Sequence, residues 1–171
     1  MARDYRRVVT SKDSQGKSVI MSDSKVSVGP LGIVELWRSS SVPASLIEDG
    51  GKLAGSVRLE PNAGGVIFRL FEIPPQDSTL SKADAEAKAS REFAAAGAEH
   101  CHVDTSRNPM MHTTRTIDYV VILSGQVTLL LDEGEVELRP FDAIVQRGTN
   151  HYWLNYGDQP ALLMGVLLDA K

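Results

Sequence analysis

The sequence predicts an all-β fold in which an antiparallel sheet closes into a barrel or packs as a sandwich. Strand-length runs rich in Val, Ile, Leu and aromatic residues recur along the chain. Turn-forming residues separate the later runs so closely that only hairpins can join them, which makes the sheet antiparallel. Because 171 residues suit one core better than two, we expect a single domain.

Short strands are expected in the N-terminal region, residues 1–75, which we predict to pack on the barrel. They are Arg7–Val9, Ser18–Met21, Gly32–Trp37 and Val66–Ile73. Glycine, proline and small polar residues between them favour turns. In the last of these strands Phe68, Leu70 and Glu72 share one face and Arg69, Phe71 and Ile73 the other, and either face can point inward.

A helix is predicted within residues 76–109, which otherwise form an insertion and a loop. Lys82–Ala96 is rich in good helix formers, Ser81 and Asp84 are spaced like a capping box, and Gly97 follows at the expected end. Alanine dominates its apolar positions, with Phe93 as the one large group. We therefore expect this helix to lie on the surface or to act as a flap.

The remaining region, residues 110–171, returns to a dense β pattern. Its predicted strands are Asp118–Leu123, Gln126–Leu131, Glu135–Leu138, Ala143–Gln146, Tyr152–Leu154 and Leu162–Leu168. Each gap between them contains glycine, proline, asparagine or aspartate, the residues that favour tight turns.

Composition excludes several classes of function. A net charge of −4 and the lack of any Lys/Arg run argue against nucleic acid as a partner. No stretch approaches the length of an apolar membrane span, so we expect a cytoplasmic protein without membrane contact. The single cysteine, Cys101, cannot form an intrachain disulfide and is interpreted as an ordinary thiol.

Candidate site residues lie on two of the predicted hairpins. Strand alternation places His112, Thr114 and Asp118 on one face, while His151 follows a tight turn and shares its face with Trp153. If the hairpins pack face to face, two imidazoles and a carboxylate converge, a set that suits a divalent transition metal with open coordination positions. The alternative is a pair of hydrogen-bonded core histidines.

The run from His112 to Gly125 resembles the first motif of the cupin superfamily, G-x5-H-x-H-x3,4-E-x6-G. His112 falls on the first histidine, Thr114 replaces the second, and Asp118 stands at the glutamate position with a shorter side chain. Ser106 occupies the position of the leading glycine.

The second cupin motif, G-x5-P-x-G-x2-H-x3-N, is matched in spacing by Gly148, His151 and Asn155. Gln146 replaces its proline, and Phe141 before Asp142 resembles the usual Gly-Asp turn shifted by one residue. Together the two motifs cover about a third of the chain.

The resemblance implies a double-stranded β-helix, or jelly-roll barrel, with extra N-terminal strands, and a homodimer. It also implies that His112, Asp118 and His151 hold a divalent metal such as Fe, Zn, Ni or Mn. Because a histidine is missing and the acid is shorter, a metal-free site is the alternative. His100 and His102, in the loop ahead of the barrel, either complete the site or are solvated.

A small-molecule ligand is expected in the pocket, in contact with Thr114, Arg115, Gln146 and Trp153. Strand alternation, however, places Arg115 on the opposite face from His112.

Three functions remain open. The first is a metal-dependent lyase, decarboxylase or isomerase acting on a small oxygenated or carboxylated molecule. The second is a non-haem iron dioxygenase, and the third is a binding module without metal or catalysis.

Overall fold

The computed structural model describes residues 4–51 and 57–171. Its strands are β1 (Asp4–Lys12), β2 (Ser18–Ser27), β3 (Ile33–Ser39), β4 (Val66–Ile73), β5 (Thr116–Ser124), β6 (Val127–Leu131), β7 (Glu135–Leu138), β8 (Ala143–Arg147), β9 (His151–Leu154) and β10 (Ala161–Asp169). The helix α1 spans Lys82–Ala95, and 3-10 turns lie at Pro30–Gly32 and Glu99–Cys101. The predicted all-β fold with extra N-terminal strands and one helical insertion is confirmed.

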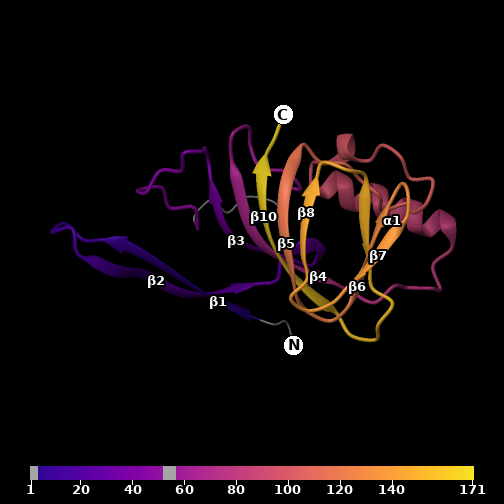
Figure 1. Cartoon of the computed structure of the whole chain (residues 1–171), viewed down its shortest axis with the longest axis horizontal. Coiled ribbons are helices and arrows are strands. Elements are labelled where there is room, and N and C mark those ends of the chain that lie inside the picture. Colours follow the sequence, from indigo (N-terminus) through magenta and orange to yellow (C-terminus); the bar gives the residue numbers. More distant parts are fainter. Residues whose placement is uncertain (1–3, 52–56) are drawn as a thin grey trace.

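Two antiparallel sheets form the barrel (Figure 1), one with the order β3-β4-β10-β5-β8 and one with the order β7-β6-β9. Side chains from both sheets meet in a shared core, including Ile122 of β5, Leu129 of β6 and Leu163 of β10. All three are at most 4% exposed. Burial of such alternating side chains between the two sheets stabilises the barrel.

Strand β4 separates the barrel interior from a second apolar cluster. Phe71 and Ile73 pack against the barrel core, whereas Phe68 and Leu70 belong to the cluster on the outer face of the sheet. The face carrying the odd-numbered residues is therefore the inner one, a choice that alternation alone left open. Phe71 lies against Gly165 of β10, where an added Cβ would come within 2.7 Å of the ring.

The hairpin of β1 and β2 extends away from the barrel as an arm (Figure 1). Near its base, Tyr5 and Val26 pack on the outer cluster, which includes Val34 and Leu70. Both strands are longer than predicted because charged and small polar residues continue the pairing beyond the short apolar runs. Residues 1–3 and 52–56 of the predicted N-terminal region lie outside the described residues.

The turn before β8 shows how the second motif departs from its pattern. Phe141 adopts a left-handed backbone conformation, with φ of 77°, and its side chain is 85% exposed. Its N–H donates to the carbonyl of Ile122 at 2.8 Å. A phenylalanine thus adopts a backbone conformation that costs glycine less free energy. The predicted shift of the Gly-Asp turn by one residue is confirmed.

Helix α1 lies beside the barrel strands (Figure 1), and its residues Lys88, Glu92 and Phe93 line the cavity described below. Ala89 and Phe93 are its buried residues, and they pack with Ala96, Ala98 and Cys101. The helix therefore lies on the surface with a small buried face, which is one of the two alternatives that its alanine-rich pattern predicted. No helix among the described residues has the length and apolar character needed to cross a bilayer.

Replacing Ser81 with alanine is expected to lower the free energy of unfolding by about 1 kcal/mol. Ser81 is the N-cap of α1, and its hydroxyl accepts a hydrogen bond from the backbone N–H of Asp84 at 3.2 Å. Chemical denaturation of both proteins measures the change. Ser90 is exposed on the same helix, so Ser90→Ala removes a hydroxyl without touching the cap. Equal losses in the two variants would contradict the assigned capping role.

Candidate functional site

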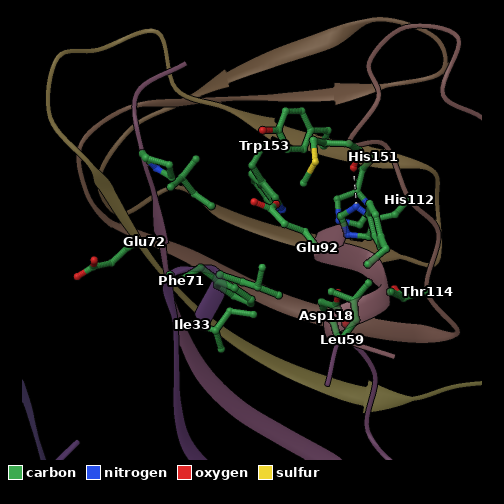
Figure 2. A pocket seen from close by; sticks show the side chains of 18 of the residues that line it. Ile33, Leu59, Phe71, Glu72, Glu92, His112, Thr114, Asp118, His151 and Trp153 are labelled. Atoms are coloured by element: carbon green, nitrogen blue, oxygen red, sulfur yellow. Dashed lines mark hydrogen bonds between the residues drawn. The ribbon is translucent and has the colours of Figure 1, made fainter. Parts of the chain in front are cut away.

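A cavity of about 450 Å³ opens inside the barrel. Apolar and aromatic side chains make up most of its wall, and the polar groups gather in a few places (Figure 2). The aromatic residues are Phe71, Phe93, Tyr152 and Trp153. The size and this mixture are typical of a small-molecule site.

His112 and His151 lie side by side on one wall of the cavity (Figure 2). An antiparallel bridge joins them: the N–H of His112 donates to the His151 carbonyl at 3.1 Å, and the reverse bond measures 3.0 Å. The tight turn at Gly148, with φ of 58°, brings the chain back so that β9 can form this bridge. The imidazole centroids are 4.4 Å apart.

Each imidazole is held in one orientation by a backbone carbonyl. Nδ1 of His112 lies 3.0 Å from the carbonyl oxygen of Met110, and Nδ1 of His151 lies 2.9 Å from that of Thr149. Because a carbonyl can only accept, each Nδ1 carries the proton, which leaves Nε2 as the lone-pair nitrogen. A backbone carbonyl that orients the ring in this way is usual behind a metal-binding histidine.

Burial keeps both imidazoles neutral. Desolvation lowers the pKa of His151 to about 3, with a further contribution from the neighbouring His112. The pKa of His112 is also lowered, mainly by desolvation. Neutral imidazoles with a free nitrogen can serve as metal ligands or as hydrogen-bond acceptors at neutral pH.

Asp118 lies on the wall formed by β5, away from the two imidazoles (Figure 2). Its side chain is 7% exposed, and its Oδ1 has no hydrogen-bond partner among the described residues. Desolvation raises the pKa of this carboxyl to about 6, against the opposing effects of Thr116 and Arg69. A buried carboxyl with this pKa can exchange a proton near neutral pH.

The three predicted metal ligands share the cavity but are not gathered within common bonding reach. Among the described residues, the ligand atoms of three His, Cys, Asp or Glu side chains lie within 4.8 Å of one another in one group only, and it is a different group. Asp118 belongs to the five-stranded sheet, whereas His151 belongs to the three-stranded sheet. Asp118 and His151 therefore approach the cavity from different sheets. The three-ligand set stays a prediction.

The structure separates the predicted substrate contacts into two groups. Thr114 and Trp153 line the cavity, but Arg115 and Gln146 are not part of its wall. Arg115 is exposed. Gln146 pairs with Asp118 across the sheet, yet its amide donates to the carbonyl of Thr149 at 3.0 Å and so holds the turn before His151.

Sequence reasoning missed other residues of the cavity wall. Lys88, Glu92 and Phe93 come from α1, a segment whose position over the barrel no strand pattern reveals. Tyr152 also lines the cavity, although strand alternation places it on the opposite face from His151. Lys88 and Glu92 lie 3.9 Å apart as an i, i+4 ion pair. Their spacing in the sequence could have predicted this contact.

A second group of polar side chains lies beside α1. Nε2 of His100 is 2.8 Å from Oε2 of Glu60 and 3.5 Å from the sulfur of Cys101. Desolvation raises the pKa of the Cys101 thiol to about 12, with a further contribution from Glu60. His102 is not in this group: its ring stacks on Phe93 with the centroids 4.9 Å apart.

Comparison with curated proteins finds relatives from fungi. The chain is 53% identical over 64 residues to phomopsin biosynthesis cluster protein C' of Diaporthe leptostromiformis, covering 36% of this chain and 34% of that protein. It is 45% identical over 65 residues to the cupin-domain-containing oxidoreductase srdD of Neurospora crassa, covering 36% and 33%. The match thus spans about a third of the length of these relatives. No protein-family model matches the chain.

Solved structures with a similar fold include a cupin 2 conserved barrel domain protein from Salinispora arenicola. It is 14% identical, with a TM-score of 0.38 and coverage of 61% of this chain and 64% of that chain. A cupin family protein from Methanocaldococcus jannaschii with a double-stranded β-helix fold is 10% identical, with a TM-score of 0.39 and coverage of 61% and 70%.

The antiparallel barrel with an internal cavity and the sequence matches to cupin-domain-containing proteins agree with the two motifs. Over about a third of its length, the chain is similar to cupin-domain-containing oxidoreductases.

Proposed function

We propose that the chain is a cupin enzyme that transfers a proton on a small, mainly apolar, oxygenated molecule, as a lyase or an isomerase does. The observation that carries this proposal is the arrangement of two neutral imidazoles opposite a buried carboxyl whose Oδ1 has no partner among the described residues. The curated relatives named as cupin-domain-containing oxidoreductases support an enzyme rather than a binding module.

Asp118 is the proposed general acid or base. A group exchanges protons most effectively when its pKa lies near the working pH, and burial brings the pKa of Asp118 to about 6. Its Oδ1 is not engaged by the described residues, so it is available to a substrate proton. Thr114, on the same side of the cavity, can orient a substrate oxygen through its hydroxyl.

His112 and His151 are the proposed holders of a divalent metal such as Fe, Zn, Ni or Mn. Their imidazole centroids lie 4.4 Å apart, and backbone carbonyls already orient both Nδ1 atoms, so the Nε2 atoms would be available to an ion. A bound metal would polarise a substrate oxygen and stabilise negative charge on it.

The cavity wall favours an oxygenated substrate over a carboxylated one. Lys88 is the one Lys or Arg side chain in the described wall, and it pairs with Glu92 at 3.9 Å. Phe71, Phe93 and Trp153 offer flat apolar surfaces to a ring or a conjugated chain. We therefore propose an aromatic or unsaturated carbonyl or hydroxyl compound as the class of substrate.

A non-haem iron oxygenase is the second candidate, because several curated relatives are named oxidoreductases. Two imidazoles with open coordination positions are compatible with iron and dioxygen. Oxygen consumption by the iron-loaded protein in the presence of a substrate would favour this candidate. Turnover without oxygen, with zinc or nickel, would favour proton transfer.

The metal part of the proposal predicts that His112→Ala and His151→Ala each carry about one metal ion fewer per chain than the wild type. Elemental analysis of freshly purified protein measures this difference. Trp153→Phe, which changes a cavity residue without a ligand atom, serves as the control and should keep the wild-type metal content. If both histidine variants retain the full content, the imidazole pair does not hold the metal.

The catalytic part predicts that Asp118→Asn slows proton transfer by about 10²–10⁴-fold. Solvent deuterium uptake into a series of small aromatic and unsaturated ketones, followed by NMR, measures this rate without knowledge of the natural substrate. Asp158 is exposed on the surface, and Asp158→Asn should exchange at the wild-type rate. Exchange by Asp118→Asn at the wild-type rate would remove Asp118 from the mechanism.

A further inference from the structure

We propose that Glu60, His100 and Cys101 form a second metal site, selective for Zn²⁺, outside the cavity. Their ligand atoms all lie within 4.8 Å of one another. Nε2 of His100 is 2.8 Å from Oε2 of Glu60 and 3.5 Å from Sγ of Cys101. This inference rests on different residues from the proposed function and does not depend on it.

The surrounding structure fixes two of the three ligands in place. Cys101 is 1% exposed, its N–H donates to the carbonyl of Ala98 at 2.9 Å, and its carbonyl accepts from Thr113 at 2.8 Å. Oε1 of Glu60 accepts the backbone N–H of Arg115 at 2.6 Å, which leaves Oε2 directed toward His100. A carboxylate oriented by such an outer hydrogen bond is a common feature of metal sites.

The third ligand is free to adjust. The side chain of His100 is 61% exposed, so its ring can move to the separation that an ion requires. Tetrahedral ligands about 2.0 Å from a zinc ion lie about 3.3 Å apart, which needs an opening of a few tenths of an ångström from the present nitrogen–oxygen contact. The same exposure leaves a side open to a fourth, water ligand.

The ligand types select the metal. A thiolate, an imidazole and a carboxylate are the three donors that bind zinc in proteins, and the thiolate disfavours Mg²⁺ and Ca²⁺. The negative charges of Glu60 and of the Cys101 thiolate would balance the two positive charges of the ion. Burial of the sulfur protects it from solvent, as is usual for a structural cysteine.

A metal at this position would join three segments that are far apart in the sequence. Glu60 precedes β4, His100 and Cys101 follow α1, and Arg115, bonded to Glu60, precedes β5. Leu59 and Phe93, from the first two of these segments, line the cavity. The site would therefore fix the end of helix α1 to the barrel next to the cavity.

Cobalt substitution tests the proposal on the full chain. The protein is stripped with a chelator and titrated with Co²⁺, which takes zinc positions and gives a thiolate-to-cobalt charge-transfer band in the near ultraviolet. We expect the band to reach a plateau as Co²⁺ is added, to vanish in Cys101→Ser, and to be displaced by Zn²⁺. Absence of the band in the wild type, or its persistence in Cys101→Ser, would overturn the proposal.

Three further variants keep the test independent of folding and of the cavity. His100 is largely exposed, so His100→Ala should fold normally and bind Zn²⁺ at least about 100-fold more weakly in competition with a chromophoric chelator. Glu99→Gln changes a neighbouring acid and should bind as the wild type does. The double variant His112→Ala/His151→Ala should retain the charge-transfer band. Wild-type zinc affinity in His100→Ala, or loss of the band in the double variant, would contradict a separate second site.

Discussion

Arg69→Met is expected to lower the free energy of unfolding by about 3–5 kcal/mol, because it removes the hydrogen bonds that a buried charged donor makes to its acceptors. The Arg69 side chain is fully buried in β4, and its Nη2 lies 2.6 Å from Oε1 of Glu35. The same nitrogen donates to the carbonyl of Arg58 at 2.6 Å. Loss of the guanidinium leaves the Arg58 carbonyl without this donor and removes the shorter of two ion pairs made by Glu35, which also lies 3.3 Å from Arg38.

The position of Arg69 gives a second measurable effect. Its charge lowers the pKa of Asp118, so Arg69→Met should raise that pKa further above 6, which NMR titration of the carboxyl carbon can follow. Arg58 is exposed and bonds to Asn62 at 2.8 Å, and Arg58→Met should change neither quantity measurably. A loss of stability below about 1 kcal/mol in Arg69→Met would show that the buried pair is not needed for the fold.

Asp118→Asn is expected to stabilise the protein at pH 7 and above while it removes the proposed proton transfer. The folded protein raises the pKa of Asp118 from 3.8 to about 6, so the folded state binds this proton more tightly than the unfolded state does. Stability from this group is therefore present below pH 4 and is lost as the pH rises through 6. The pKa difference corresponds to an upper bound of roughly 3 kcal/mol.

Urea unfolding of both proteins at pH 4.5 and pH 7.5 isolates the contribution of Asp118 to the free energy of unfolding. The difference between Asp118→Asn and wild type should be larger at the higher pH. The buried histidines act with the opposite sign, because the lowered pKa of His151 makes the folded state less stable as the pH falls below its ordinary value of 6.5. That contribution is common to both proteins and cancels in the comparison. An equal difference at the two pH values would show that Asp118 titrates normally.

Local sequence patterns predicted most of the secondary structure because the ends of the strands and of the helix coincide with turn-forming or capping residues. Val66–Ile73 was predicted with the bounds of β4, since Gly65 precedes it and Pro74 follows. The helix beginning at Lys82 was predicted from the Ser81 cap. Strand β1 was predicted too short, because its outer residues are charged and lie on an exposed hairpin where no apolar pattern marks them.

Alternation also predicted which motif side chains face the cavity, but not the distances across it. His112, Thr114, Asp118 and His151 all line the wall as expected. The separation of Asp118 from the imidazoles follows from the spacing of the two sheets, which side-chain parity does not encode. The group of Glu60, His100 and Cys101 joins two loops whose contact depends on the packing of α1. Such a contact has no periodic signal in the sequence.

One face of β4 packs inside the barrel and the other contacts the arm, which has a consequence for changes in the sequence of this strand. Phe71 faces the cavity, while its neighbour Glu72 accepts a hydrogen bond from the Tyr5 hydroxyl at 2.6 Å. A one-residue insertion in this strand would exchange the two sets of side chains and damage both surfaces at once. A single substitution in this strand is therefore expected to affect one surface, whereas a shift of its frame affects both.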